Sequence, residues 1–417
     1  MTAKYRELIQ SLGPGLLYAG AAIGVSHLVQ STRAGAEFGS ILIIAVVLAH
    51  IFKYPFFEFG PRFASVTGKS LLHGYRWQGE WALMLFLFLT LSTMFIVQAA
   101  VTVVTVGIAQ HISGLDIEAW QWSGILLTIC AFILLLGRYS VLDRFMKVII
   151  ITLAITTVFA LGSALMGDFY HADELKKIFS FRTNEHLFFL IALVGWMPAP
   201  IDIAIWHSVW TVARNRSGQK KHQKKEALFD FKVGYWGTAG LAICFLLLGS
   251  VMLYGSGQEL PKSGAAFAGL LIDMYTKALG PWSYYLIVIA AFTTMFSTTL
   301  TLLDAFPRVL RPSIKLLLHE KRKTNNQSMY NWALLVLIAG TMLILVFFAN
   351  NMQGLVDLAT TISFLTAPVL AWLNYRSVTH TNFPEEHRPS RNLRVLSGLG
   401  IFFLGAFSLY FLYVRFL

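Results

Sequence analysis

The chain has 417 residues, of which 56% are hydrophobic and 13% are charged. Soluble domains usually carry about 25% charged residues, so this composition and the mean hydropathy of +0.63 exclude an ordinary soluble domain and indicate a polytopic membrane protein. The net charge of +12 does not indicate nucleic acid binding. The basic residues lie in short loops between apolar stretches, as expected for a membrane protein whose basic loops face the cytoplasm.

Eleven apolar stretches are long enough to cross a bilayer, which takes about 20 residues. The first, second and third lie at 13–37, 41–61 and 81–110, and the others follow at 122–137, 145–166, 187–212, 231–254, 282–303, 330–349, 353–375 and 394–416. We therefore predict an all-α membrane protein with one transmembrane domain, 1–417. Cys130 and Cys244 both lie in apolar stretches, so neither a disulfide framework nor a cysteine zinc site is expected.

The distribution of basic residues predicts the orientation. The polar start, Met1–Gln10, has no cleavable signal pattern and is expected to be a cytoplasmic tail. With this end inside, most of the 33 Lys and Arg residues fall in cytoplasmic segments, and the carboxyl terminus lies outside. The expected location is the plasma membrane or a bacterial inner membrane. The basic loop Arg214–Lys225 is either an orientation signal or a contact for lipid or a regulator.

Two of the stretches are interrupted near their middles, at corresponding places in the two halves of the chain. The first contains Gly13-Pro14-Gly15 and then 21–27, and the second contains 194–200. A helix broken inside lipid leaves backbone groups unpaired, which is tolerated only where they line a cavity or bind a substrate. Paired breaks are typical of secondary transporters built from inverted repeats. We expect repeat one at about 13–166, repeat two at about 187–375 and an extra helix at 394–416.

Four short motifs resemble those of the natural resistance-associated macrophage protein (NRAMP) family of proton-coupled divalent-metal transporters. They are Gly13-Pro14-Gly15-Leu16, Ala34-Gly35-Ala36-Glu37-Phe38-Gly39, Arg62 with Val66-Thr67-Gly68-Lys69, and Met197-Pro198. The resemblance implies a leucine-transporter-like fold with five plus five helices in inverted repeats and an eleventh helix. It also implies alternating access around a midplane site.

The metal-binding motif of the family is altered in this chain. Where the family has Asp-Pro-Gly-Asn, the chain has Gly24-Val25-Ser26-His27. The second acidic residue of that helix falls on Ser31, and the histidine that follows Met-Pro falls on Ala199. The alanine whose carbonyl contributes to the metal site falls on Val194, where a backbone carbonyl survives the substitution. Of the side-chain ligands that the resemblance implies, only Met197 is retained.

This substitution changes the expected cargo. Manganese and ferrous ions favour oxygen and nitrogen ligands, and a dication without an anionic ligand keeps a desolvation cost of several kcal/mol that neutral dipoles offset only partly. Met197, His27 and Ser26 would form a neutral site, suited to a soft monovalent ion and poor for Mn²⁺. A fully hydrated Mg²⁺ needs fewer direct ligands. The alternative is an organic solute, for which Gly24 makes room and Trp196 offers an aromatic wall.

Ionisable residues inside the spans are further functional candidates. Asp202, on the second half of the broken sixth span, could neutralise a cationic substrate, carry a coupled proton, or pair with Arg33, Lys232 or a helix amide. Glu58 could relay protons or form an ion pair with Lys53. His27 could bind the cargo or carry a proton. His207 is also ionisable, but for this residue a snorkelling or loop-contact role is expected rather than chemistry.

Hydroxyl groups in the eighth and tenth spans, at Thr293–Thr301 and Thr360–Ser363, could line a hydrophilic path or pack helices together. Substrate contacts are expected at Gly24, Ser26, His27, Val194, Met197 and Asp202. Proton coupling is expected at Asp202, Glu58 or His27, and metal contacts at Met197 and His27.

Three functions remain open. The first is an ion-coupled secondary transporter that moves a metal cation with altered selectivity, the second is a transporter of a small organic solute on the same fold, and the third is a non-transporting membrane sensor or scaffold. No catalytic triad or phosphate-binding glycine loop occurs in the sequence, so an enzyme is not expected, nor is a cofactor. The expected partners are the cargo and the lipid bilayer, and the oligomeric state is left open.

Overall fold

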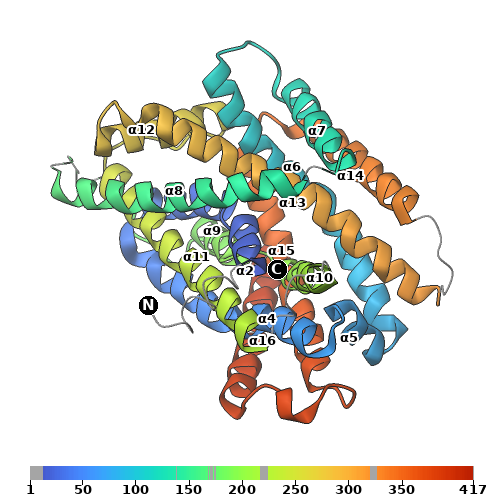
Figure 1. Ribbon diagram of the computed structural model, residues 1–417. Coiled ribbons are helices and arrows are strands. Elements are labelled where there is room, and N and C mark those ends of the chain that lie inside the picture. Colours follow the sequence, from blue (N-terminus) through green and yellow to red (C-terminus); the bar gives the residue numbers. More distant parts are fainter. Residues whose placement is uncertain are drawn as a thin grey trace, which may run out of the picture.

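The computed structural model of the protein describes residues 13–137, 139–167, 169, 172, 175–216, 224–319 and 326–416 (Figure 1). In this part of the chain every regular element is a helix, which confirms the predicted all-α class. Eight helical segments of the described residues are long and apolar enough to cross a membrane, and two shorter helices are also apolar. Each apolar stretch of the sequence coincides with a helix or with a pair of helices. The five-plus-five repeat stays a prediction, and Met1–Gln10 lies outside the described residues.

The first broken span consists of consecutive helical pieces. They are α2 (Pro14–Ala22), a π-helical turn η1 (Ser26–Ser31), α3 (Thr32–Phe38) and a short 3₁₀ turn η2 (Gly39–Leu42). The rest of the first half contains α4 (Ile43–Thr67), α5 (Leu71–Gln78), α6 (Glu80–Ser113), α7 (Ala119–Leu135) and α8 (Tyr139–Met166).

The second half also begins with a broken span, α9 (Asn184–Trp196) and α10 (Asp202–Arg216). The elements that follow are α11 (Lys224–Leu253), α12 (Gly264–Leu279), α13 (Ser283–Leu317), α14 (Asn326–Phe348), α15 (Met352–Thr379), the 3₁₀ turn η4 (Glu385–His387) and α16 (Arg391–Phe416). In Figure 1 the broken helices α2, α9 and α10 lie near the centre of the bundle, and α9 packs against α15. The short helices α5 and α12 were not expected from the sequence.

Glycines let the broken helices approach whole helices closely. A Cβ atom at Gly35 would lie 1.9 Å from the carbonyl oxygen of Leu246, which places α3 directly against α11. A Cβ atom at Gly195 would lie 2.2 Å from the carbonyl oxygen of Thr360, which places α9 directly against α15. Small residues that allow such backbone contact are typical of membrane helix packing. Each broken span is therefore held in place by an unbroken one.

The beginning of α2 is fixed by a side chain from α11. The carboxylate of Asp230 accepts hydrogen bonds from the backbone N–H groups of Gly13, at 2.9 Å, and Gly15, at 2.7 Å. Helix amino termini have N–H groups without partners in the helix, and a carboxylate stabilises them through both hydrogen bonding and charge. Pro14 between the two glycines is also suited to a first helical position.

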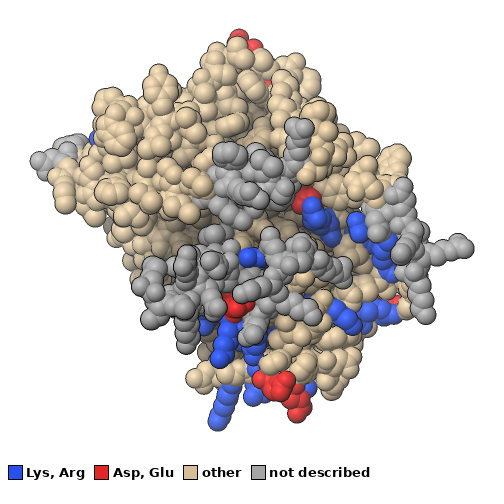
Figure 2. Space-filling view, viewed as in Figure 1, with Lys and Arg blue, Asp and Glu red and all other residues tan. Residues whose placement is uncertain are grey.

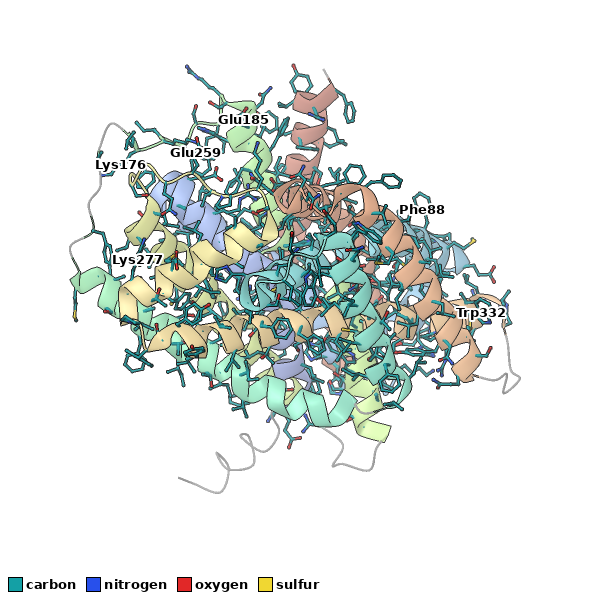
Figure 3. The ribbon with its side chains drawn as sticks, turned by 90° about the horizontal axis from the view of Figure 1, so that it is seen from above. Phe88, Lys176, Glu185, Glu259, Lys277 and Trp332 are labelled. Carbon is teal, nitrogen blue, oxygen red and sulfur yellow. The ribbon has the colours of Figure 1, made fainter. Side chains whose placement is uncertain are left out.

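The surface agrees with a membrane protein. Large apolar side chains such as Phe88 and Trp332 are 66% and 67% exposed, and both lie on the outer side of the bundle in Figure 3, while Lys176, Glu185 and Glu259 lie near one another at another side. Figure 2 shows Lys and Arg gathered on the lower part of one face, with a mostly uncharged upper part. Apolar surface of this extent indicates contact with lipid.

Candidate functional site

Both predicted breaks are present. Helix α2 ends at Ala22, and η1 begins at Ser26, with Ile23 outside the helical conformation at φ −76° and ψ 94°. Helix α9 ends at Trp196, and Met197 is also extended at φ −92° and ψ 119°, before α10 begins at Asp202. The two halves of the chain therefore each bring a non-helical segment into the interior of the bundle.

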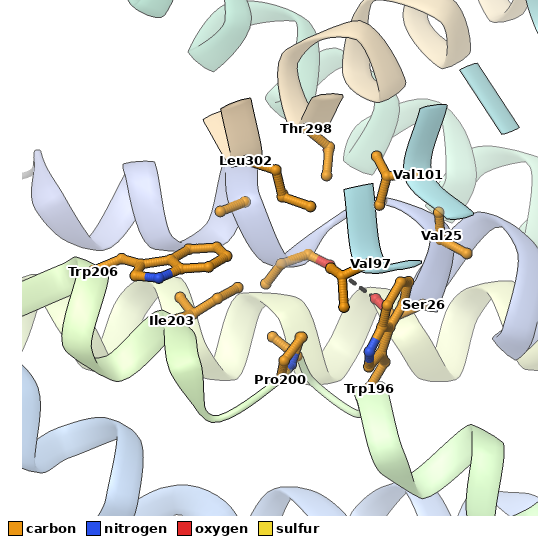
Figure 4. Close-up of a pocket in the computed structure, with 14 residues that line it drawn as sticks. Val25, Ser26, Val97, Val101, Trp196, Pro200, Ile203, Trp206, Thr298 and Leu302 are labelled. Carbon is orange, nitrogen blue, oxygen red and sulfur yellow. Dashed lines mark hydrogen bonds between the residues drawn. The ribbon is translucent and has the colours of Figure 1, made fainter. Parts of the chain in front are cut away.

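A small cavity of about 30 Å³ lies between the two breaks (Figure 4). Figure 4 shows Trp196 and Trp206 at opposite ends of it, with Ser26 near Trp196 and Thr298 across the cavity. The cavity is lined by Ala21, Ala22, Gly24, Val25, Ser26, Val97, Val101, Trp196, Ala199, Pro200, Ile203, Trp206, Thr298 and Leu302. The expected contributions of Gly24, Ser26 and Trp196 to this cavity agree with the structure.

Hydroxyl groups satisfy the carbonyls of the first break. Ser26 Oγ lies 2.8 Å from the carbonyl oxygen of Ala22 and 2.7 Å from His27 Nδ1, and its single proton is shared between these two acceptors. Thr298 Oγ1 lies 3.4 Å from the carbonyl oxygen of Ile23 and 3.5 Å from that of Gly20, and it also donates to the Thr294 carbonyl at 3.1 Å. The neutral hydroxyls are thus the polar groups nearest the cavity. The hydroxyl run of α13 contributes both to packing and to the cavity wall.

His27 is fully buried and does not line the cavity. Its Nε2 lies 3.1 Å from the carbonyl oxygen of Thr238, which can only accept, so Nε2 carries a proton. Its Nδ1 lies 2.7 Å from Ser26 Oγ. Both ring nitrogens are therefore engaged, and His27 offers no free nitrogen to a metal in this conformation.

Met197 also lies outside the cavity wall, although it belongs to the second break. It is fully buried, and its sulfur lies 3.9 Å from Ser31 Oγ, on η1 of the first broken span. The thioether thus bridges the two broken spans beside the cavity.

Lys53 of α4 holds the second break, and sequence reasoning missed this role. Its side chain is fully buried, and Nζ donates to the carbonyl oxygens of Val194, at 2.6 Å, and Gly195, at 2.8 Å. The predicted contact of the Val194 carbonyl is therefore made to an ammonium group of the chain itself. The available signal was a single lysine in an apolar span, with no acidic residue three or four positions away.

The structure separates the carboxylate candidates. Glu58 accepts from Arg62 Nε at 2.9 Å and from Tyr54 at 2.7 Å, so the alternative in which it pairs with Lys53 is wrong. Asp202 is 8% exposed in the first turn of α10 and forms no ion pair with any residue that the structure describes. The alternative in which Asp202 pairs with Arg33 is also wrong, because Arg33 contacts Asp357.

His207 lies deeper than expected. It is 1% exposed, and its ring stacks on Tyr18 with ring centroids 5.8 Å apart. Phe231 and Tyr235 complete this aromatic cluster. The predicted snorkelling role is therefore wrong, because the rings of Tyr18 from α2 and Phe231 from α11 pack against His207.

An ion pair connects α3 to α15 on the other side of the cavity. Arg33 donates to Asp357 at 2.7 Å, and Gln30 donates to the same carboxylate at 3.1 Å. The guanidinium carbon of Arg33 lies 5.0 Å from the centre of the Phe189 ring. This pair joins the end of the first broken span to a whole helix.

Comparisons with known proteins identify the family. A family model described as "Natural resistance-associated macrophage protein-like" matches residues 15–414. An uncharacterized protein from Pasteurella multocida (strain Pm70) is 36% identical over 406 residues, which cover 96% of this chain and 92% of that protein.

Solved structures share the fold at low identity. The manganese transporter of Eremococcus coleocola superimposes with a TM-score of 0.70 at 15% identity, covering 98% of this chain and 87% of that chain. MhsT in complex with L-phenylalanine gives a TM-score of 0.61 at 14% identity and covers 97% of this chain and 98% of that chain. These likenesses confirm the leucine-transporter-like fold. Members of the matched family are membrane transporters rather than enzymes, as predicted. The chain belongs to the natural resistance-associated macrophage protein-like family of integral membrane proteins.

Proposed function

We propose that the chain is an ion-coupled secondary transporter that moves a metal cation, with a selectivity shifted away from hard dications, by alternating access around the two breaks. Family membership supports transport, and a manganese transporter is among the structures that share the fold. The observation that carries the proposal is the cavity of about 30 Å³ between the breaks. A site needs roughly 10–15 Å³ of such space for one water molecule, so this one suits a cargo the size of a single ion.

The donor groups support the altered selectivity. Among the described residues that line the cavity there is no Asp, Glu or His, and the side-chain oxygens in its lining are the hydroxyls of Ser26 and Thr298. Met197 adds a thioether beside them. Neutral oxygen and sulfur donors suit a soft or monovalent ion, whereas Mn²⁺ would enter without a compensating anion.

Asp202 is the candidate for proton coupling. The structure describes four buried carboxylates: Glu58 is bonded to Arg62, Asp230 to the start of α2, and Asp304 to Arg308 and Tyr330, whereas Asp202 forms no such contact with a described residue. A carboxylate without a fixed partner inside a membrane protein can exchange a proton during the cycle. We further propose a cytoplasmic amino terminus and an external carboxyl terminus, supported by the gathering of basic side chains on one part of the surface in Figure 2.

Uptake into proteoliposomes tests the transport proposal. The purified protein is offered Mn²⁺, Fe²⁺, Cd²⁺, Cu⁺, Ag⁺ and Tl⁺ separately, with protein-free liposomes as the control. We expect saturable uptake of a soft or monovalent ion, weak uptake of Mn²⁺, and a reduction in Met197→Ala. If none of these ions enters faster than into protein-free liposomes, metal transport is rejected.

An organic solute is the second candidate, favoured by the two indoles at the ends of the cavity. Trp206 is 2% exposed, and its Nε1 has no hydrogen-bond acceptor among the described residues, so it could donate to a bound solute. A thermal-shift screen tests this candidate: we expect a solute of this kind to stabilise the wild type and to lose the effect in Trp206→Phe. The third candidate, a non-transporting sensor, rests on the loop 214–225, of which 217–223 lie outside the described residues. Measurable uptake would exclude it.

A further inference from the structure

The carboxyl end of α9 resembles a cation site that is already filled. The last carbonyl groups of a helix have no partner within the helix and carry partial negative charge. At the end of α9, the carbonyls of Val194 and Gly195 both point to the ammonium of Lys53, at 2.6 and 2.8 Å. In transporters with broken helices, such half-helix ends are the groups that coordinate a coupling cation.

Among the described residues, the hydrogen-bond partners of the Lys53 ammonium are the carbonyl groups at the end of α9. No carboxylate of a described residue lies within ion-pair distance of Nζ, and Glu58 is bonded to Arg62 and Tyr54 instead. One turn earlier on α4, His50 Nδ1 contacts the carbonyl oxygen of Val46, and its Nε2 is buried without a partner among the described residues. A buried charge needs compensation, and here two backbone dipoles provide it.

We propose that the Lys53 ammonium is a tethered monovalent cation, and that it occupies a site which would bind a free monovalent cation such as Na⁺ or K⁺ if the side chain were removed. The site consists of the Val194 and Gly195 carbonyls and the space that the Lys53 stem now fills. The wild-type protein therefore needs no free monovalent cation to hold the second break. The inference concerns this second break and does not depend on which cargo the cavity takes.

The tethered charge also affects selectivity. A fixed positive charge at the end of α9 repels any second cation from the same carbonyls. Ions that enter the bundle are thereby directed to the first break, where Ser26 and Thr298 supply neutral donors.

Thermal unfolding of Lys53→Ala tests the proposal. The purified variant is heated in NaCl, KCl, methylammonium chloride or choline chloride at equal ionic strength, beside wild type and Lys232→Ala, whose exposed lysine lies on α11. We expect Lys53→Ala to be stabilised by one of the small cations relative to choline, by about 2 °C or more. Wild type and Lys232→Ala are expected to respond equally to all four salts.

Lys53→Met is the second variant, because its side chain fills the volume without a charge. We expect it to melt lower than wild type and to show no cation-specific recovery. A folded Lys53→Ala protein that responds equally to all four salts would overturn the proposal. If neither variant can be purified folded, the unfolding temperature of the wild type decides: specific stabilisation by Na⁺ or K⁺ contradicts a filled site, and equal values in all salts support it. None of these readouts involves transport, so their outcome is separate from that of the proposed function.

Discussion

The two helix breaks meet around one cavity, but different groups satisfy their backbones. At the first break, neutral hydroxyls of Ser26 and Thr298 bond the exposed carbonyls, at 2.8 to 3.5 Å. At the second, the Lys53 ammonium bonds two carbonyls at 2.6 and 2.8 Å. Hydrogen bonds from a charged donor are roughly twice as strong as neutral ones. The first break is therefore the one whose carbonyls a cargo can reach by displacing weak contacts, and the second is held firmly by the chain.

Loss of the charge at the second break should have the largest effect on stability. Lys53→Met removes the charged donor from both carbonyls; the Val194 carbonyl keeps the Met197 N–H at 3.3 Å, whereas the Gly195 carbonyl loses its donor, at a cost of about 1–3 kcal/mol. We expect the free energy of unfolding in detergent to fall in Lys53→Met. The decrease should be several times larger than in Lys232→Met, which replaces an exposed lysine. Denaturant titration measures both. Equal changes in the two variants would show that the Lys53 contacts contribute little.

Filling the first break should block transport with little change in folding. A Cβ atom at Gly24 would lie 3.0 Å from Thr298 Oγ1 and 3.1 Å from its Cγ2, so Gly24→Val places a branched side chain in the cavity. The added side chain takes up space in the cavity that the cargo would occupy, and we expect uptake to fall by about tenfold or more, which corresponds to a loss of about 1.4 kcal/mol in cargo binding. Gly398→Val is the control, because a Cβ atom there meets nothing within 4 Å. Uptake that is unchanged in Gly24→Val would argue against this cavity as the cargo site.

Asp202, at the start of α10 beyond the second break, should affect coupling more than binding. We expect Asp202→Asn to lose most of the uptake driven by an imposed pH gradient and to keep exchange of cargo across the membrane, because the amide cannot exchange a proton. Asp273→Asn, at an exposed position of α12, is the matched control. Parallel assays of gradient-driven uptake and of exchange separate the two effects. A pH-driven rate equal to wild type would remove Asp202 from the coupling mechanism.

The ion pair between α3 and α15 should have the smallest effect. Asp357 is partly exposed, and the buried guanidinium of Arg33 keeps Glu37 at 3.7 Å when Asp357 is replaced, so we expect a loss of about 1 kcal/mol. Asp357→Asn should therefore change the equilibrium for separation of α3 from α15 by no more than about fivefold. The labelling rate of a cysteine placed beside the cavity measures this change. Glu385→Gln, which removes the exposed Arg388–Glu385 pair at 2.9 Å, should leave the labelling rate unchanged.

The backbone architecture could be predicted from the sequence because it depends on local patterns. Glycine and proline in apolar stretches placed both breaks, and the lengths of the apolar runs placed the helices. Gly24 and Ser26 were found in the cavity because they lie within the first break. Trp206 and Thr298 could not be placed there, since the packing of α10 and α13 against the first break is not visible in any local pattern.

The partners of buried polar groups were harder to predict. Glu58 lies five positions after Lys53, and residues at that spacing point to different faces of a helix, whereas Arg62 follows Glu58 by four. His27 was expected as a ligand or proton carrier because it is a histidine at the position of the family's metal-binding motif. Its engagement by Thr238 depends on α11, which is more than two hundred positions away in the chain.

The carboxylate of Asp230 that holds the amides of Gly13 and Gly15 has a consequence for movement. It joins the amino-terminal end of α2 rigidly to the neighbouring turn of α11. The two backbones also approach closely at Gly15 and Gly234. A tilt of α2 must then carry α11 with it. In the proposed transport cycle, the bend that such a movement requires would fall at Ile23 and Gly24, so the segment proposed to contact the cargo would also be the hinge.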